Sequence, residues 1–385
     1  MDADVLIIGA SPAGLMAARE ASTGGADVIL IDKKPGMDVS PHPANTFFKT
    51  MFDKTGEDVD QNYVIKNLKG AHIISPTGNR VTVESIGYFI DRTKFDMYYA
   101  AQVRNAGVDI RMGVEAYNVI KSGNTFTVST SKGPLKTKIV IAADGINSNI
   151  AQLLGLKTVK HPEDIAWAME AEIESDGIGN PDMFEYYLGS VAPGWKSTYS
   201  PCGNNRATIG VYVRRHGIDV SEFFDNWLEK FKSIKGLDDL KIINKKTGGD
   251  PIACIPNQIV SDGIMVVGGA AGQSGIGYGM RAGQIAGNVA ADALLKGDVS
   301  KRVLSQYRKV WNSEFRTEYY LGRIALETLR KMDDHEIDEM MKNFEGQDLS
   351  FIKGSPFNQA MQIGMFLLQN NPKALLSYKA LLRNK

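Results

Sequence analysis

Cysteine is scarce in this sequence, which contains only Cys202 and Cys254 and no C-x-x-C pairing. This scarcity argues against a disulfide framework, a zinc site or an iron–sulfur cluster, so no metal is expected. We expect both cysteines to be small buried hydrophobic residues. An excess of charge is absent too, because 44 Lys and Arg residues balance 44 Asp and Glu residues. The sequence therefore predicts no nucleic-acid partner.

Long apolar runs, internal repeats and low-complexity segments are also absent. No stretch approaches the roughly 18 apolar residues that span a bilayer. The 385 residues, 43% hydrophobic and 23% charged, are enough for one large domain or two to three smaller ones. The expectation is a globular protein of the reducing cytoplasm, with at most a peripheral membrane contact through apolar residues near the C-terminus. These residues are Met361, Ile363, Met365, Phe366 and Leu367.

A glycine-rich turn near the N-terminus is the strongest pattern in the sequence. Residues 5–8 form an apolar run, 9–14 read Gly-Ala-Ser-Pro-Ala-Gly, and an alanine-rich helical pattern follows. A second strand-like run at 27–31, apolar from residue 28 onward, is closed by Asp32, 18 residues after Gly14. Continuous apolar runs are typical of parallel strands buried on both faces. The order strand, glycine turn, helix, strand predicts a Rossmann-type βαβ unit.

The residue types in this turn suit a dinucleotide. Glycines permit the tight turn, the close approach of a pyrophosphate and close helix–strand packing, and backbone amides at the helix start bind the anion. Ser11 occupies the middle position, where its hydroxyl can donate to phosphate. A carboxylate such as Asp32 at the end of the second strand can bind the adenosine ribose. A βαβ unit without a nucleotide remains the alternative.

Further motifs indicate FAD as the dinucleotide. Residues 142–145 (Ala-Ala-Asp-Gly) and 266–272 (Val-Val-Gly-Gly-Ala-Ala-Gly) resemble the second and third parts of the fingerprint of FAD-dependent hydroxylases. Within that p-hydroxybenzoate hydroxylase-like superfamily, the chain most resembles the geranylgeranyl reductase family of archaeal lipid biosynthesis. The resemblance is carried by residues 9–18, 88–96, 139–145, 187–194 and 264–283.

The resemblance implies an FAD-dependent oxidoreductase that reduces C=C bonds of a prenyl chain in isoprenoid or phospholipid metabolism. It implies that FAD is bound by Gly9, Ala10, Ser11, Ala13, Gly14, Asp32, Lys33, Arg92, Ala116, Asp144, Gly269, Gly277, Gly279 and Met280. An ion pair of Arg92 with Asp91 or Asp96 is the alternative for that residue. The implied partners are a prenyl lipid as substrate and reduced ferredoxin or NAD(P)H as the electron donor.

Three departures from the family pattern affect the site. Gly269 stands where the family usually has an Asp that binds the ribityl chain, and Ala44 stands near the position of a family cysteine. The aromatic-rich segment that contacts the hydrocarbon is altered, and reads Trp-Lys-Ser-Thr-Tyr-Ser-Pro-Cys at 195–202.

Candidate catalytic and substrate residues follow from the same segments. His42 and Asn45, in the loop after the second strand, are candidates for supplying or orienting a proton. A structural role for His42 in the turn between two prolines is the alternative. Tyr187, Trp195 and Tyr199 are candidates for an apolar substrate site, with plain core packing as the alternative.

The expected fold is mixed α/β, with a Rossmann-type FAD-binding domain, an inserted antiparallel-sheet substrate domain and a C-terminal helical segment. The expected boundaries are 1–75, 93–163 and 250–297 for the first, 76–92 and 164–249 for the second, and 298–385 for the third.

Two other functions stay open. An aromatic-ring monooxygenase would use the same fold with O₂, and a flavin-binding protein without catalysis would fit the lost polar groups at 44 and 269.

Overall fold

The computed structural model describes residues 1–39, 45–215, 217–252, 254–273 and 275–344. The chain forms two compact units, each assembled from three separate stretches. Unit 1 consists of Met1–Val64, Ile90–Pro162 and Cys254–Arg316. Unit 2 consists of the described residues of Ile65–Phe89, Glu163–Ala253 and Thr317–Lys385. His42, Ala44 and the apolar residues at 361–367 lie outside the described residues.

Unit 1 is built on a six-stranded sheet with the order β16-β17-β10-β1-β2-β6. Its strands are β1 (Val5–Ile8), β2 (Val28–Asp32), β6 (Asp109–Met112), β10 (Ile139–Ala142), β16 (Val260–Ser261) and β17 (Ile264–Val266). All pairs are parallel except β16 with β17. Every residue of β1 and β10 is buried, as the continuous apolar runs predict.

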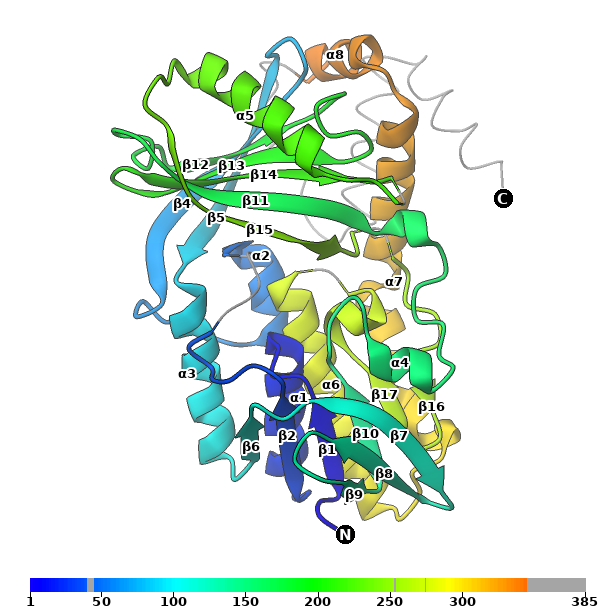
Figure 1. Ribbon diagram of the computed structural model, residues 1–385. Coiled ribbons are helices and arrows are strands. Elements are labelled where there is room, and N and C mark those ends of the chain that lie inside the picture. The colour runs from blue at the N-terminus through cyan, green and yellow to red at the C-terminus, as the bar shows by residue number, and fades with distance from the viewer. Residues whose placement is uncertain (40–44, 216, 253, 274, 345–385) are drawn as a thin grey trace. The chain divides into compact units, whose positions relative to one another are not determined.

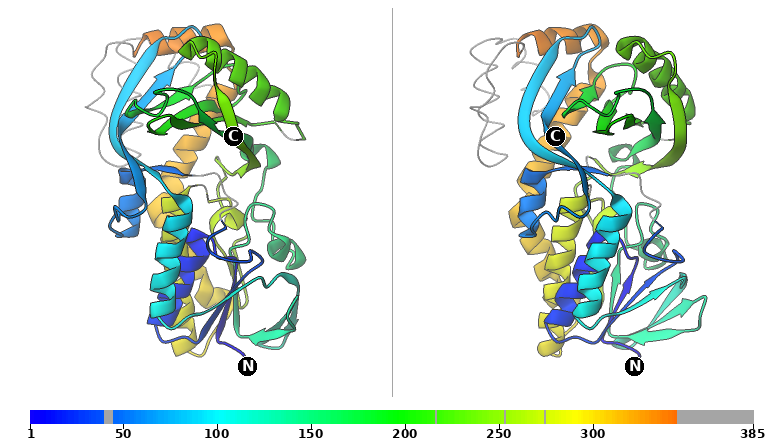
Figure 2. Two further views of the ribbon diagram at one scale, coloured as in Figure 1. Left: turned by 60° about the vertical axis from the view of Figure 1, so that its left-hand side comes forward. Right: turned by 90° about the vertical axis from the view of Figure 1, so that its left-hand side faces the viewer.

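Helices cover one face of this sheet and a small sheet covers the other (Figures 1 and 2). The helices are α1 (Pro12–Thr23), α3 (Arg92–Asn105) and α6 (Ile276–Leu295); the small sheet contains β7 (Ala116–Ser122), β8 (Thr125–Thr130) and β9 (Leu135–Thr137). Helices α1 and α6 can pack closely because Gly283 and Gly287 have no side chain. A Cβ at these positions would overlap the carbonyls of Ala13 and Ala17, respectively.

Short elements complete the described part of unit 1. They are β3 (Thr46–Phe48), α2 (Lys49–Phe52), η1 (Asp53–Thr55), α4 (Asn149–Leu153) and η3 (Gly268–Ala271), with η2 (Pro162–Asp164) at the boundary of the two units. β3 is the last strand of an eight-stranded sheet with the order β15-β11-β14-β13-β12-β4-β5-β3.

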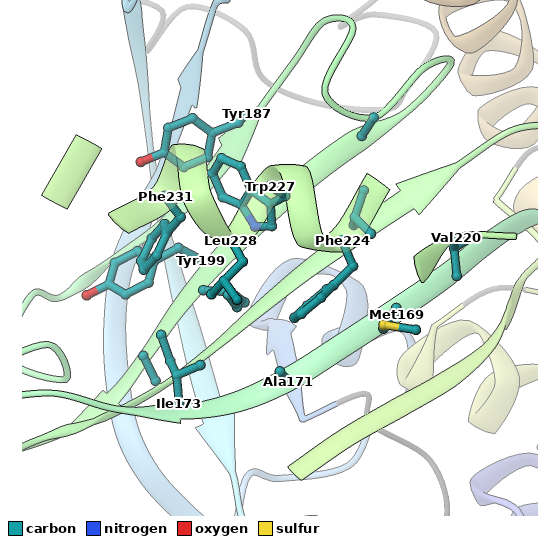
Figure 3. Packing of buried hydrophobic residues seen from close by; sticks show 14 of the residues in the cluster. Met169, Ala171, Ile173, Tyr187, Tyr199, Val220, Phe224, Trp227, Leu228 and Phe231 are labelled. Carbon is teal, nitrogen blue, oxygen red and sulfur yellow. The ribbon is translucent and has the colours of Figure 1, made fainter. Parts of the chain in front are cut away.

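The eight-stranded sheet forms the body of unit 2. Its other strands are β4 (Val64–Ile74), β5 (Arg80–Ile90), β11 (Ala166–Glu174), β12 (Met183–Tyr187), β13 (Lys196–Gly203), β14 (Arg206–Val213) and β15 (Lys241–Asp250). Strands β15, β11, β14, β13 and β12 pair antiparallel, whereas β12 and β4 pair parallel. Helix α5 (Ser221–Lys235) packs its apolar face, including Phe224, Trp227 and Phe231, on one face of the sheet (Figure 3).

Two further helices follow in sequence, α7 (Lys301–Lys331) and α8 (Asp334–Lys342). Helix α8 starts with a capping box between Asp333 and Glu336. Its Asp338 accepts hydrogen bonds from Ser75 and Thr77 of the β4–β5 turn. Helix α8 therefore packs on that hairpin.

Among the described residues, no helix combines the length and apolar character that crossing a membrane requires.

The expected fold class is confirmed by the parallel sheet, the antiparallel sheet and the late helices. The expected domain boundaries stay a prediction. The compact units divide residues 298–385 between 316 and 317, and they place residues 65–75 in unit 2. These residues form most of β4, which pairs with β12 in unit 2. The reason lies in a strand pairing between segments more than 100 positions apart.

Candidate functional site

The turn between β1 and α1 requires its glycines. Gly9 has φ +110°, and a Cβ there would overlap the carbonyl of Ala143 at the end of β10. A Cβ on Gly14 would overlap the carbonyl of Gly9 itself. The turn therefore folds tightly onto the neighbouring strand only because both positions lack a side chain.

Ser11 is the N-cap of α1. Its Oγ accepts a hydrogen bond from the Gly14 amide at 3.2 Å and donates one to the Ala143 carbonyl at 3.3 Å. The hydroxyl thus connects the helix start to β10. Among the described residues, the backbone amides of Ser11 and Ala13 have no hydrogen-bond acceptor. These two donors point to an anion as the missing acceptor.

Asp32 ends β2 beside the same turn. Its Oδ2 accepts from the Ala10 amide at 2.6 Å, and its Oδ1 accepts from the Lys34 amide at 2.8 Å. The carboxylate therefore holds the glycine turn and the start of the next loop, which contains Lys33. Each oxygen keeps a further lone pair with which to accept a ribose hydroxyl.

Asp144 lies two residues after the end of β10, within the predicted second motif. Its Oδ1 accepts from the Ser148 hydroxyl at 2.5 Å, and its Oδ2 accepts from the Ile150 amide at 3.2 Å. Burial raises the pKa of Asp144 in spite of these hydrogen bonds. Its position shapes the loop into α4 and leaves the next residue, Gly145, with open space around its Cα.

The third motif forms η3 and the start of α6. A Cβ on Gly269 would lie 3.3 Å from the Ile146 amide nitrogen, so this residue faces the loop after Asp144. Gly277 is packed against the backbone of Met51, whereas a Cβ on Gly279 would approach no atom of another residue closer than 3.7 Å. Met280 is fully buried.

A buried hydrogen-bond chain supports η3, and the sequence analysis did not find it. Gln273 Oε1 accepts from the Gly268 amide at 2.6 Å, and Gln273 Nε2 donates to the Tyr307 hydroxyl at 2.8 Å. The Tyr307 hydroxyl in turn donates to the carbonyl of Val266 at 3.0 Å. Gln273 directly follows the glycine motif at 266–272, but Tyr307 comes from α7 and carries no sequence signal.

Arg92 and Ala116 belong to unit 1 as well. Arg92 starts α3, and its Nε lies 2.9 Å from Asp96 Oδ1, with the arginine side chain 11% exposed. The ion pair proposed as the alternative role of Arg92 is therefore present. Ala116 is the first residue of β7 and is the cross-strand partner of Thr130. A flavin contact of either residue stays a prediction.

These observations fit a dinucleotide in unit 1. All residues predicted to contact FAD belong to this unit, and the three motifs follow β1, β10 and β17, which are adjacent in one sheet. Open backbone at residues 145 and 279 and unpaired amides at 11 and 13 leave room and donors for such a group. The carboxyl ends of parallel strands are the usual location of this kind of site.

The catalytic candidates are described only in part. His42 lies outside the described residues. Asn45 precedes β3; its carbonyl accepts from the Ile90 amide at 2.8 Å, and its Oδ1 accepts from the Thr46 hydroxyl at 3.4 Å. A proton-supplying role for either residue stays a prediction.

The three aromatic candidates for the substrate site occupy two different environments. Tyr187 and Tyr199 are buried beneath α5, where their rings lie 4.7 Å from Trp227 and 5.4 Å from Phe231 (Figure 3). This packing is the core role considered as their alternative. Trp195 is partly buried, and its Nε1 has no hydrogen-bond partner among the described residues. Contact of any of the three with substrate stays a prediction.

Both cysteines are buried, as expected for small hydrophobic residues. Burial, reinforced by Glu172, raises the pKa of Cys202 to about 11. A thiol with a raised pKa is a poor nucleophile and a poor metal ligand.

The parallel sheet and the glycine turn define the class of dinucleotide-binding oxidoreductases, and comparisons with known proteins agree. Residues 6–172 match the family described as pyridine nucleotide-disulphide oxidoreductase. Digeranylgeranylglycerophospholipid reductase 1 of Methanothermobacter thermautotrophicus is 33% identical, with 97% of each chain covered. The reductase of the same name from Methanocaldococcus jannaschii is 32% identical over 91% of this chain and 94% of its own.

The chain therefore belongs to the digeranylgeranylglycerophospholipid reductase family, and it is an oxidoreductase. The solved structure of a geranylgeranyl bacteriochlorophyll reductase-like protein from Thermoplasma acidophilum superposes with a TM-score of 0.89 and 25% identity. The superposition covers 98% of this chain and 99% of that one. The family resemblance and the fold class expected from the sequence are both confirmed.

Proposed function

We propose that the protein is an FAD-dependent reductase that adds hydrogen to isolated C=C bonds of prenyl chains. The observation that carries this function is the β1–α1 turn, whose unpaired Ser11 and Ala13 amides suit a pyrophosphate, in a chain of the reductase family. The substrate class is a prenyl lipid. The donor is reduced ferredoxin or NAD(P)H, and a peripheral membrane contact would bring the enzyme to its substrate.

The proposed roles of the residues in unit 1 follow from their positions. Ser11, Ala13 and the start of α1 bind the pyrophosphate, and Asp32 accepts the ribose hydroxyls while it holds the Ala10 amide. Lys33 and Arg92 add positive charge to the same unit. Gly279 leaves the backbone of α6 open to the flavin, whereas Gly269 and Gly277 allow close packing against the backbones of Ile146 and Met51.

Alkene reduction needs a hydride on one carbon and a proton on the other, and reduced FAD supplies the hydride. An unactivated alkene has no carbonyl to polarise, so positioning and proton supply must do most of the work. His42 is the proposed proton source and Asn45 the residue that orients it. The buried Cys202, with its raised pKa, is not proposed for this role.

The function is tested with the purified, FAD-loaded protein. The flavin is reduced anaerobically with dithionite, and a geranylgeranyl lipid is added. We expect flavin reoxidation together with a product mass that rises by two hydrogens per reduced bond. Absence of both changes would exclude the reductase function, and oxygen consumption stimulated by a phenol would favour a monooxygenase instead.

The cofactor site is tested separately by Asp32→Ala. Loss of the carboxylate removes the acceptor of the Ala10 amide and the proposed ribose contact, so FAD occupancy should fall on the order of tenfold. The measurement is the flavin-to-protein absorbance ratio after gel filtration. Asp27→Ala is the control, because that residue lies at the start of β2, where its side chain is exposed. Equal occupancy in both variants would show that the ribose contact is misassigned.

A further inference from the structure

The face of the eight-stranded sheet opposite α5 is unusually polar. Side chains alternate along a strand, and Met169 and Ala171 of β11 lie in the core beneath α5 (Figure 3). Glu170 therefore lies on the opposite face. The cross-strand row that contains Glu170 continues through Lys246 on one side and Gly210, Thr198 and Tyr186 on the other. In the adjacent row, Lys196 pairs with Tyr212.

Gly210 lets the polar side chains of this face converge. A Cβ at this position would lie 2.9 Å from Glu170 Cγ and 3.0 Å from Thr198 Oγ1. It would also lie 3.1 Å from Cε2 of the Tyr212 ring. The first distance is shorter than real Cβ contacts and the other two are tight, so a larger residue would shift these side chains. The missing side chain is thus a condition of the cluster.

Lys196 lies among aromatic rings. Its Nζ is 4.4 Å from the ring centre of Tyr186, and 5.1 Å from those of Trp195 and Tyr212. These distances are typical of cation–π contacts. The ammonium has three N–H donors, and among the described residues it makes no hydrogen bond. The rings hold the charge in place without satisfying its donors.

Glu170 leaves one acceptor unused beside this lysine. Its Oε1 accepts a hydrogen bond from the Tyr212 hydroxyl. Its Oε2 is buried and has no hydrogen-bond partner among the described residues. Burial raises the pKa of Glu170 to about 7 and lowers that of Lys196 to about 8. The buried Oε2 of Glu170 without a partner costs about 1–3 kcal/mol, so proteins retain such an atom where a ligand completes it. Lys196 is half-buried, and its free N–H donors can turn to the same ligand.

The charges of this face define the chemistry of the ligand. Lys196 and Lys246 are balanced by Glu170 and by Asp250, which also acts on the charge of Lys196. A phosphate would bring further negative charge to two carboxylates. A hydroxyl group, in contrast, is both acceptor and donor, and it can satisfy Lys196 and Glu170 together.

We propose that Lys196, Glu170 and Tyr212 form a specificity site that binds an uncharged hydroxyl group of the substrate. The assignment rests on the proposed function in one respect, because it takes the hydroxyl to be attached to a prenyl chain. The prenyl substrate is then recognised by a polar end as well as by its hydrocarbon. Lys196 is the residue that distinguishes an oxygenated chain from a plain one.

The test is a binding measurement with the full-length, FAD-loaded protein. Three probes share one prenyl chain: geranylgeraniol, the corresponding hydrocarbon without oxygen, and geranylgeranyl diphosphate. Dissociation constants are measured by quenching of tryptophan fluorescence. The alcohol should bind on the order of tenfold more tightly than the hydrocarbon, as expected for a hydrogen bond to a charged group. The diphosphate should bind no more tightly than the alcohol.

Lys196→Met should abolish the preference for the alcohol while leaving hydrocarbon binding unchanged. Lys245→Met is the matched control, because Lys245 lies one position from Lys246 on β15, is 41% exposed and pairs with Asp225. This control should keep the preference. A wild-type protein that binds alcohol and hydrocarbon equally would overturn the proposal even if Lys196→Met does not fold. A diphosphate that binds more tightly through Lys196 would also overturn it.

The outcome is separable from that of the reductase function. The same three compounds are offered to the dithionite-reduced enzyme, and flavin reoxidation is followed. A Lys196-dependent preference without reoxidation would retain the hydroxyl site and reject prenyl-chain reduction. Flavin reoxidation without a preference for the alcohol would retain prenyl-chain reduction and reject the hydroxyl site.

Discussion

The candidate sites of the two units hold polar groups in different ways. In unit 1, the β1–α1 turn pairs backbone amides with carbonyls, the Ser11 hydroxyl and the Asp32 carboxylate. In unit 2, the groups concerned are ionisable side chains, of which Arg214 is fully buried and Glu170 and Lys196 are half-buried. A backbone site depends on residues close together in sequence, whereas a side-chain site depends on strands that meet only in the folded chain. The first kind of site suits a common cofactor, and the second can vary with the substrate.

The most sensitive point of unit 2 is a buried charge cluster. Arg214 is fully buried; its Nη2 lies 2.7 Å from Glu327 Oε1 and 3.4 Å from Asp164 Oδ1. Arg214→Ala leaves two carboxylates without this partner and should lower the free energy of unfolding by about 3–5 kcal/mol. The measurement is urea denaturation followed by far-UV circular dichroism.

Arg206→Ala is the control for the buried cluster. Arg206 also pairs with a glutamate, Glu172, but its side chain is 55% exposed. The loss should stay below about 1 kcal/mol, as for other exposed ion pairs. Equal losses of unfolding free energy in the two variants would mean that burial does not determine how much an ion pair stabilises unit 2. The contrast between the two units would then weaken.

The backbone turn of unit 1 is tested by Gly9→Ala. A side chain at φ +110° is strained, and its Cβ would overlap the carbonyl of Ala143, so the protein should lose about 2–4 kcal/mol and most of its FAD. Unfolding by urea and the flavin-to-protein absorbance ratio report the two effects.

Gly25→Ala separates the effect of backbone strain at positive φ from the effect of steric overlap by the new Cβ. Gly25 has φ +93°, but a Cβ there would meet no atom within 4 Å. Its cost should be about 1–2 kcal/mol, with FAD retained. If Gly25→Ala lost as much FAD as Gly9→Ala, the close approach of the turn to the end of β10 would not explain FAD binding.

A smaller effect is expected when the family aspartate is restored. In Gly269→Asp the new Cβ would lie 3.3 Å from the Ile146 nitrogen, a contact that a shift of a few tenths of an ångström relieves. The carboxylate should add one hydrogen bond to the ribityl chain and tighten FAD binding by about 1 kcal/mol, roughly fivefold. Titration of the apoprotein with FAD measures the change. Gly269→Ala provides the same Cβ without the carboxylate and should not tighten binding.

The smallest predicted effect concerns the Cys202 thiol. Burial raises its pKa to about 11, so below pH 9 both the folded and the unfolded thiol are protonated and the shift leaves stability unchanged. Stability should decrease as the pH rises through 9, where the unfolded thiol ionises first. At pH 8 a disulfide reagent should modify the native protein slowly and the urea-unfolded protein rapidly. Rapid native modification at Cys202 would contradict its burial.

Much of unit 1 was predictable because its signals are local. The apolar runs at 5–8 and 28–31, the glycines between them and Asp32 form a continuous stretch, and sterics alone restrict what it can fold into. The family resemblance extended this prediction to Asp144 and Gly269. Gln273 and Tyr307 were missed because the hydrogen bond between them joins η3 to α7, and no local pattern specifies that pairing.

The sequence by itself determined the class of fold, the dinucleotide turn and the reductase family, because each depends on residue types at fixed short spacings. Only the tertiary structure decided which side chains share a face of the eight-stranded sheet. It paired Glu170 with Gly210 and Lys196 with Tyr212 on separate strands, and it buried Tyr187 and Tyr199 under α5. The physical reason is register: a shift of one residue in a strand exchanges its two faces, and register is set by partners distant in sequence.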